Sequence, residues 1–163
     1  MDTTTNTITP RDLLGRYLND VEEKYAPKTL FIAGSMKLPV PGPCVSIVGT
    51  RKPSQQGIDA TSRIAKELVK KGVVVVSGLA RGIDTVAHWT AIENGGKTIA
   101  VLGTPLTRFY PPENMELQKL IMEKYLAISQ FPPSHFTQRK DFVFRNRHLG
   151  DFGPPSLIPF SLI

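Results

Sequence analysis

Short, continuous apolar runs alternate in this chain with longer segments in which apolar residues recur every three or four positions. The runs are residues 44–48, 73–76, 98–102 and 126–130. They have the length of strands and mostly lack the apolar–polar alternation of a strand with one wet face. Strands buried on both faces and separated by amphipathic helices are typical of parallel sheets. The pattern therefore predicts an α/β fold, a three-layer sandwich in which helices flank both faces of a mostly parallel sheet.

The segments that follow the first three runs predict helices. Residues 55–71 and 83–94 have helical spacing, and each is followed by glycine, a typical stop because it adopts left-handed backbone. Another helix follows Pro111-Pro112. In a parallel sheet the loops after the strands emerge at one edge, where ligands bind. We therefore expect the functional residues in the loops after the first two strands.

The segment before the first run is patterned less regularly. Residues 1–9 are polar and predict a frayed tail, and one helix is expected from Pro10 through Val21, ended by Pro27. A short strand is expected over 29–33.

The first loop, residues 49–54, suits an anion. Gly49 lets backbone approach a ligand closely, Thr50 and Ser54 offer hydroxyls, and Arg51 offers a planar fork that matches phosphate oxygens. Ser54 stands where a helix N-cap belongs, so unpaired N–H groups of the helix point the same way. The alternative is an ordinary turn with a solvated arginine. No Gly-x-Gly-x-x-Gly spacing follows the strand, so no dinucleotide cofactor is predicted.

The second loop repeats this chemistry with Ser77, Gly78 and Arg81. Asp84 falls in the first turn of the next helix and would compete with a phosphate for the same N–H groups, so we expect it to be structural. His88 lies four residues further on, but no nucleophile is spaced to complete a catalytic pair with Asp84. A structural hydrogen bond is the favoured interpretation.

A third segment, residues 139–148, combines cations with aromatic residues in the way that single-strand nucleic-acid surfaces do. Phe142 lies three residues from both Arg139 and Arg145, so all three are expected to face the same way. We expect Phe142 to stack on a base, because burying it would draw those charges into a low dielectric. Phe144 is expected in the core.

The composition agrees with a polyanionic partner. Lys and Arg number 20 against 14 Asp and Glu, which gives a net charge of +6 and a pI near 9.6. Cys44 is the single cysteine, which excludes an intrachain disulfide. No apolar stretch approaches the roughly 20 residues of a membrane span, and the first residues do not resemble a signal peptide. A cytoplasmic location is expected, and no metal site is predicted.

Four ordered segments resemble motifs of the DNA-processing protein A (DprA/Smf) family. They are VSIVGTRKPS at 45–54, VVVSGLARGIDTVAH at 74–88, GKTIAVLG at 96–103 with YPPEN at 110–114, and the run from Arg139 through Phe142 to Arg145-Asn146-Arg147. The resemblance covers about residues 28–148. It implies an extended Rossmann fold that binds single-stranded DNA and helps load RecA recombinase during natural transformation. It implies no catalytic activity, and its partners are single-stranded DNA, RecA and a second copy of the chain.

The resemblance also implies which residues line the DNA pocket, with Phe142 stacking on a base. Together with the two loops, it gives the predicted site: Gly49, Thr50, Arg51, Ser54, Ser77, Gly78, Arg81, Arg139, Phe142, Arg145, Asn146 and Arg147.

Three segments are expected from this alignment of motifs. Residues 1–27 form an N-terminal tail and helix, and 28–150 form the DNA-binding domain, which is incomplete at its C-terminal end because family members continue with a helix and strands. Residues 151–163 form an apolar tail outside the family pattern, of the kind a truncated or frame-shifted product carries. Its three prolines predict either disorder or an irregular cover on a sheet edge.

Two rival interpretations stay open at this stage. Related Rossmann-like proteins hydrolyse nucleoside monophosphates with the glutamate of a Pro-Gly-Gly-x-Gly-Thr-x-x-Glu pattern, and the segment 95–98 here lacks that glutamate. The other alternative is a nucleotide-sensing module or degenerate remnant without a role on DNA.

Overall fold

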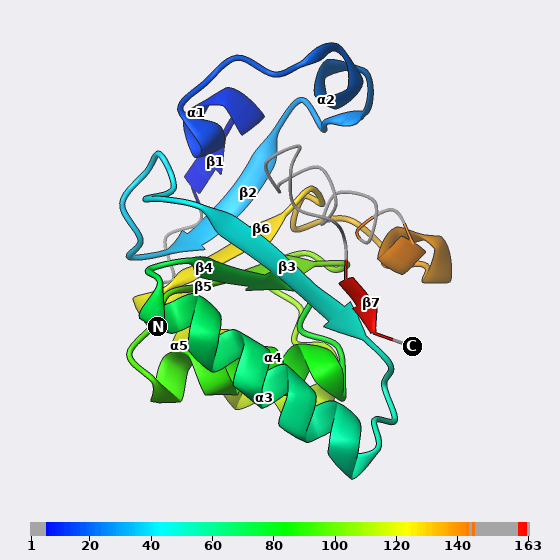
Figure 1. The fold of residues 1–163 in the computed structure, drawn as a ribbon. Coiled ribbons are helices and arrows are strands. Elements are labelled where there is room, and N and C mark those ends of the chain that lie inside the picture. Colours follow the sequence, from blue (N-terminus) through cyan, green and yellow to red (C-terminus); the bar gives the residue numbers. More distant parts are fainter. Residues whose placement is uncertain (1–5, 144, 146–159, 163) are drawn as a thin grey trace.

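A single seven-stranded sheet, in the order β1-β2-β6-β5-β4-β3-β7, organises the computed structural model (Figure 1). The structure describes residues 6–143, 145 and 160–162. The strands are β1 Asn6–Ile8, β2 Leu30–Gly34, β3 Cys44–Gly49, β4 Val74–Ser77, β5 Thr98–Leu102, β6 Leu126–Ser129 and β7 Phe160–Leu162. The helices are α1 Pro10–Leu14, α2 Asp20–Tyr25, α3 Gln55–Lys70, α4 Ile83–Glu93, the 3-10 turn η1 Pro112–Asn114 and α5 Met115–Lys124. Residues 139–143 and 145 are also helical.

The predicted α/β class and mostly parallel sheet are confirmed. Among the described strands, β6, β5, β4, β3 and β7 pair in parallel, and the β1–β2 and β2–β6 pairs are antiparallel. The strands β3 to β6 advance across the sheet in chain order. Since such crossovers are right-handed, α3, α4 and α5 all lie on one face of the sheet (Figure 1).

The opposite face of the sheet is covered by the N-terminal part of the chain. Leu13 of α1 is buried there, and Met36, Leu38 and Val40 pack against the same cluster. Alternate residues of a strand lie on opposite faces of the sheet. Val74 and Val76 of β4 belong to this cluster, whereas Val75 packs on the other face with Ala65 of α3 and Ala87 of α4.

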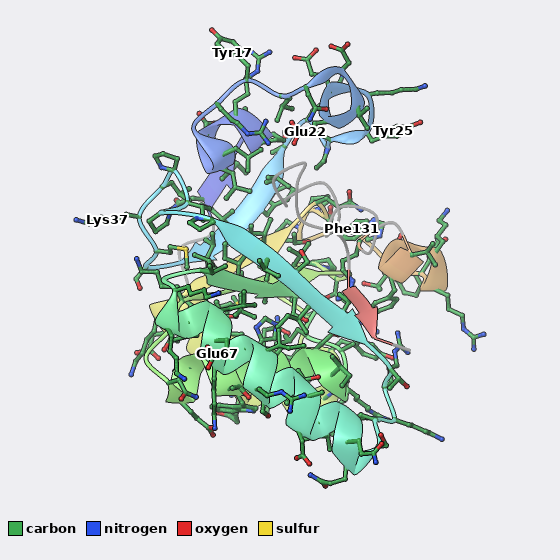
Figure 2. All side chains as sticks on the ribbon, in the orientation of Figure 1. Tyr17, Glu22, Tyr25, Lys37, Glu67 and Phe131 are labelled. Carbon is green, nitrogen blue, oxygen red and sulfur yellow. The ribbon has the colours of Figure 1, made fainter. Side chains whose placement is uncertain are left out.

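The N-terminal region corrects two expectations. The single helix predicted from Pro10 to Val21 is two short helices, because Gly15 takes left-handed backbone at φ 66° and ends α1. Asn19 then caps α2 by accepting from the backbone of the first turn. Tyr17, in the connection, extends away from the sheet and is 79% exposed (Figure 2).

Residues 6–8 are a strand and not a frayed tail. This strand, β1, pairs antiparallel with β2, with Ile8 opposite Leu30. The pairing satisfies backbone hydrogen-bonding groups along β2. A segment of three residues is too short for its periodicity to predict such a strand. Residues 1–5 lie outside the described residues.

The C-terminal tail also departs from expectation. Residues 160–162 form β7, which pairs in parallel with Ile47, Val48 and Gly49 of β3. The prediction of disorder or irregular structure is wrong for these three residues, although they lie at a sheet edge as that prediction allowed. Pro159 precedes the strand, so every residue of β7 keeps its backbone N–H for the ladder. Residues 151–159 and 163 fall outside the described part of the chain.

None of the helices in the described ranges combines the length and the apolar character that a membrane span needs.

Candidate nucleic-acid interface

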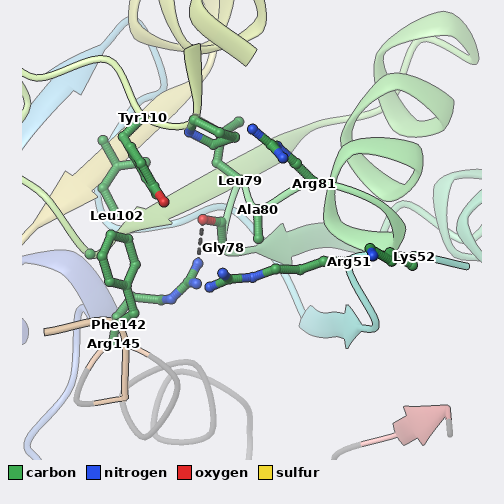
Figure 3. Close-up of a pocket in the computed structure, with 12 residues that line it drawn as sticks. Arg51, Lys52, Gly78, Leu79, Ala80, Arg81, Leu102, Tyr110, Phe142 and Arg145 are labelled. Atoms are coloured by element: carbon green, nitrogen blue, oxygen red, sulfur yellow. Dashed lines mark hydrogen bonds between the residues drawn. The ribbon is translucent and has the colours of Figure 1, made fainter. Parts of the chain in front are cut away.

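A cavity of about 240 Å³ opens at the carboxyl ends of β4 and β5, beside the loop after β3 (Figure 3). This is the edge at which the sequence predicts ligand binding. The cavity is lined by Arg51, Lys52, Gly78, Leu79, Ala80, Arg81, Leu102, Gly103, Tyr110, Pro111, Phe142 and Arg145. Five of the twelve predicted site residues are among them, namely Arg51, Gly78, Arg81, Phe142 and Arg145.

In the first loop the cationic side chains line the cavity, whereas the hydroxyls accept hydrogen bonds from nearby backbone N–H groups. Ser54 is the predicted N-cap of α3 and accepts from the Gly57 N–H at 3.2 Å. The Thr50 hydroxyl accepts from the Lys52 N–H, also at 3.2 Å. Arg51 and Lys52 are exposed and line the cavity. Lys52 is therefore a lining residue that the sequence reasoning missed, although its charge was visible in the loop.

Gly49 ends β3 beneath this loop and does not line the cavity. A Cβ at Gly49 would meet the Ile83 side chain at 2.7 Å, so the glycine allows α4 to pack closely against β3. Gly49, Thr50 and Ser54 therefore shape the loop that presents Arg51.

At the second loop, a carboxylate of the protein itself takes the place that a bound phosphate would occupy. Asp84 is 3% exposed, and its Oδ2 accepts from the backbone N–H groups of Gly78 at 3.2 Å and Ala80 at 3.3 Å. The predicted structural role of Asp84 is confirmed, because it occupies the N–H groups that a bound phosphate would use.

Ser77 ends β4 and Arg81 lies in the loop that follows, and the two side chains differ in exposure. Ser77 is fully buried and donates its hydroxyl to the Ile47 carbonyl at 2.6 Å, so the structure does not bring this predicted site residue to the cavity. The reason is the alternation of side chains along a strand. Ser77 lies two residues after Val75, so its side chain lies on the same face of the sheet, the one that α3 and α4 cover. Arg81 is exposed at the cavity mouth, where Nη2 lies 2.5 Å from Oε1 of Glu113.

Arg145 forms the floor of the cavity together with Gly78. The guanidinium is 4% exposed, donates from Nη1 to the Gly78 carbonyl, and lies 3.8 Å from Asp84 Oδ2. A Cβ at position 78 would overlap the guanidinium, so Arg145 holds this position only opposite glycine. Burial raises the pKa of Asp84 and lowers the pKa of Arg145, with their mutual attraction opposing both shifts.

This position of Arg145 corrects the expectation that Arg139, Phe142 and Arg145 all face the same way. Arg139 is exposed and does not line the cavity, whereas Arg145 is buried beneath it. The fold tolerates the buried cation because the Gly78 carbonyl and the Asp84 carboxylate compensate its lost hydration.

Aromatic and aliphatic side chains form the remaining wall of the cavity. Phe142 is half-buried and lies against Gly103, with its ring centroid 5.2 Å from that of Tyr110 at an angle of 46°. Figure 3 shows both rings beside Leu102 and across from the Arg51 side chain. Tyr110 was not predicted as a site residue, although its aromatic ring beside two prolines after the third apolar run was a visible signal.

Asn114 of η1 braces the second loop from behind. This buried amide donates to the Leu79 carbonyl at 2.9 Å and contacts the Thr85 hydroxyl at 2.8 Å. Leu79 has φ 61°, a left-handed conformation that is unfavourable for a branched aliphatic residue. The hydrogen bond from Asn114 therefore holds the strained backbone that displays Gly78 and Ala80 to the cavity.

The helical segment that carries Phe142 is anchored at its start. Asp141 is 2% exposed and accepts from the Gln138 N–H at 2.7 Å. Its carboxylate also lies 2.8 Å from Nε2 of His135, whose ring stacks on Phe131 with centroids 4.4 Å apart. These contacts fix the direction from which Phe142 enters the cavity wall.

His88 is structural, as expected, but its partner is not Asp84. It is completely buried, with Nδ1 2.7 Å from the Thr98 hydroxyl. Burial, together with the nearby Arg145 charge, lowers the pKa of His88 to about 3. The imidazole is thus neutral at physiological pH and takes no part in the cavity.

The predicted contacts Asn146 and Arg147, and the predicted core residue Phe144, lie outside the described residues. Within the described ranges, no cluster of three or more potential metal ligands occurs.

The sequence of this chain is similar to that of DNA-processing proteins of several bacteria. The family model described as DNA recombination-mediator protein A matches residues 12–151. The DNA processing protein DprA of Streptococcus pneumoniae is 43% identical over 129 residues, which are 78% of this chain and 45% of the relative. The Bacillus subtilis DprA is 38% identical over 121 residues, 74% of this chain and 41% of the relative. The chain thus spans less than half the length of these two relatives.

Two solved structures agree with the fold. The X-ray structure of DprA from Streptococcus pneumoniae superposes with a TM-score of 0.79 at 38% identity, over 92% of this chain and 52% of the other. The second structure is that of DNA processing protein A from Helicobacter pylori and concerns the single-stranded DNA binding mode of that protein. It gives a TM-score of 0.78 at 27% identity. That match covers 93% of this chain and 67% of the other.

Proposed function

Because the chain belongs to the DNA recombination-mediator protein A family, we propose that it binds single-stranded DNA at the cavity above β4 and β5, with little sequence preference. It acts as a recombination mediator that loads RecA recombinase onto DNA taken up during natural transformation. This role requires no catalytic step and no cofactor, and it is performed in the cytoplasm.

The observation that carries the proposal is the division of the cavity into a charged side and an aromatic side. Arg51, Lys52 and Arg81 are exposed at the mouth, whereas Phe142 and Tyr110 line the wall. Single-strand binding sites combine cations that follow the phosphates with aromatic faces that stack on bases. A mononucleotide site on a Rossmann-like sheet would need free N–H groups at the strand ends, and here Asp84 accepts from those of Gly78 and Ala80.

The position of the two rings on the wall of a cavity favours a single strand over a duplex. Bases in a duplex are stacked and paired, and they must be turned out of the helix to enter such a cavity, which takes a few kcal/mol. An unpaired base enters without that penalty. Stacking accepts any base, which agrees with binding that has little sequence preference.

The residues of the site have different parts in this proposal. Arg51 contacts phosphate and Phe142 stacks on a base. Arg139, which is exposed beside the cavity wall segment, and Asn146 and Arg147 give further contacts to the strand. Further groups position these contacts: Gly49, Thr50 and Ser54 shape the first loop, and Arg145 holds the Gly78 backbone.

Titration of a labelled single-stranded oligonucleotide, against its duplex and a mononucleotide, tests the proposal. If Z phosphates are neutralised, the logarithm of affinity falls with the logarithm of salt concentration at a slope of about −0.7Z. Arg51→Ala is expected to weaken binding by about 1.5–3 kcal/mol, because a charge-assisted contact is lost. Arg63→Ala on α3, an exposed arginine that does not line the cavity, is the matched control. Salt-independent binding, or equal affinity for the mononucleotide, contradicts the proposal.

A further inference from the structure

We propose that Tyr110 is a base-contacting residue and that, with Phe142, it forms a two-plane aromatic wall that accepts one unpaired nucleobase. This inference rests on the proposed function. It adds a second aromatic contact from a segment far from Phe142 in the chain.

The arrangement of the two rings sets how a base is held. The centroids of Tyr110 and Phe142 are 5.2 Å apart and their planes are inclined by 46°. Rings this close are already in contact, so no base fits between them. Their inclination instead presents two adjoining surfaces, on which a base stacks against one ring and meets the edge of the other, both favourable aromatic geometries.

Tyr110 keeps an aromatic surface available at the cavity. Its side chain is 41% exposed, and Figure 3 shows the ring directed into the cavity above Phe142. The neighbouring Phe109 is similarly exposed at 37%, but Lys119 lies over its ring at 5.7 Å and Phe109 does not line the cavity. The two consecutive aromatic residues therefore differ in what they face.

The backbone before Tyr110 is held in place by buried side chains. The Ser129 hydroxyl donates to the Thr104 carbonyl at 2.7 Å, and the fully buried Gln118 amide donates to the Arg108 carbonyl at 3.2 Å. After Tyr110, Asn114 is tied to Leu79. An exposed ring on a braced segment loses little conformational entropy when a ligand binds, which favours its use as a contact.

The two cations of the first loop direct the base toward Tyr110. Among the lining residues, Arg51 and Lys52 come from the loop after β3, across the cavity from the two rings (Figure 3). A nucleotide bound with its phosphate near those cations turns its base to the aromatic side. Tyr110 therefore contributes to affinity through the base and not through the phosphate backbone.

The test compares an intact single-stranded oligonucleotide with one that carries abasic sites throughout. Tyr110→Ala is expected to weaken binding of the intact strand roughly 5- to 150-fold, the range for loss of one stacked base. Binding of the abasic strand should be unchanged. Tyr110→Phe should retain wild-type affinity, and Tyr110→Leu, which keeps apolar bulk without a π-face, should behave like the alanine variant. Phe109→Ala is the matched control and should bind both strands as wild type does.

Two outcomes overturn the inference: wild-type affinity of Tyr110→Ala and Tyr110→Leu for the intact strand, or equal loss on the intact and abasic strands. Equal loss would mean that Tyr110 only supports the loop. Wild-type protein that binds neither strand would instead refute the proposed function itself. A weakened Phe142→Ala beside an unaffected Tyr110→Ala would refute this inference alone.

Discussion

The floor and the mouth of the cavity both contain arginine, in opposite surroundings. At the floor, Arg145 is 4% exposed and is held by the Gly78 carbonyl and Asp84. At the mouth, Arg51 and Arg81 are exposed, and Arg81 is paired with Glu113 on the surface. The same side chain therefore serves two purposes within one site.

Desolvation distinguishes the pair at the floor from the arginines at the mouth. Burial shifts the pKa of Asp84 upward and that of Arg145 downward, so desolvation outweighs their mutual attraction. A buried pair of this kind adds little net stability, but removing one partner leaves an uncompensated charge. We therefore expect the floor to control the free energy of unfolding and the mouth to control DNA affinity.

The largest effect is expected from Arg145→Ala. It leaves Asp84 buried without its cation and should lower the free energy of unfolding by about 3–5 kcal/mol, measured by urea denaturation. The double variant Asp84→Asn/Arg145→Met removes both charges but keeps an amide oxygen that can accept from the Gly78 and Ala80 N–H groups, so it should recover most of that loss. An Arg145→Ala protein with unchanged stability and reduced DNA affinity would remove the distinction between floor and mouth.

The next prediction concerns His88, which lies beneath the floor. Its folded pKa of about 3 is below the ordinary 6.5, because burial disfavours the charged imidazole. Above pH 6.5 the imidazole is neutral in both states and the stability is fully present. As pH falls from there toward 3, the unfolded chain binds a proton that the folded chain excludes, so the free energy of unfolding falls by about 1.4 kcal/mol per pH unit.

Urea denaturation across this pH range checks the His88 prediction, with His88→Gln as the reference. The difference in slope between wild type and the variant isolates the histidine from the carboxylates. Identical slopes would mean that His88 takes up its proton over the same pH range in the folded and the unfolded protein.

Phe142→Ala distinguishes the aromatic wall from the core. Affinity for a single-stranded oligonucleotide should fall by about 1–3 kcal/mol, because one stacking surface is lost. The ring is only half-buried, so the loss of stability should stay below the 3–5 kcal/mol typical of a buried Phe→Ala change. Phe136→Ala, at an 81% exposed phenylalanine, is the control for both measurements. A large drop in melting temperature with unchanged affinity would assign Phe142 to the core.

The smallest effect is expected at the mouth from Glu113→Gln. The Arg81–Glu113 pair is more than half exposed on both sides, and such pairs contribute about 0–1 kcal/mol. Without the competing carboxylate, Arg81 is free for phosphate, so DNA affinity should rise by up to about fivefold and become more salt-dependent. Glu116→Gln, which removes an equal charge from a pair with Lys119, is the control. Reduced affinity of Glu113→Gln would mean that the pair positions Arg81 productively.

Much of the fold followed from local patterns in the sequence. The strand predicted at 98–102 has those bounds in the structure, and the other three central strands agree to within a residue at each end. The N-cap at Ser54 and the left-handed Gly72 were likewise predictable, because capping and glycine conformation depend on a few neighbouring residues. For the same reason the edge of the sheet at which the cavity opens and the exposed Arg51 could be located from the chain alone.

What only the tertiary structure decided depends on partners distant in the sequence. Arg145 is buried because of a carbonyl 67 residues away, and Tyr110 faces the cavity because the segment after β5 is braced by β6 and α5. The edge strands β1 and β7 exist through pairing with β2 and β3. No local pattern encodes such pairings, since the direction of a side chain in a loop is set by which remote group satisfies its charge or covers its ring.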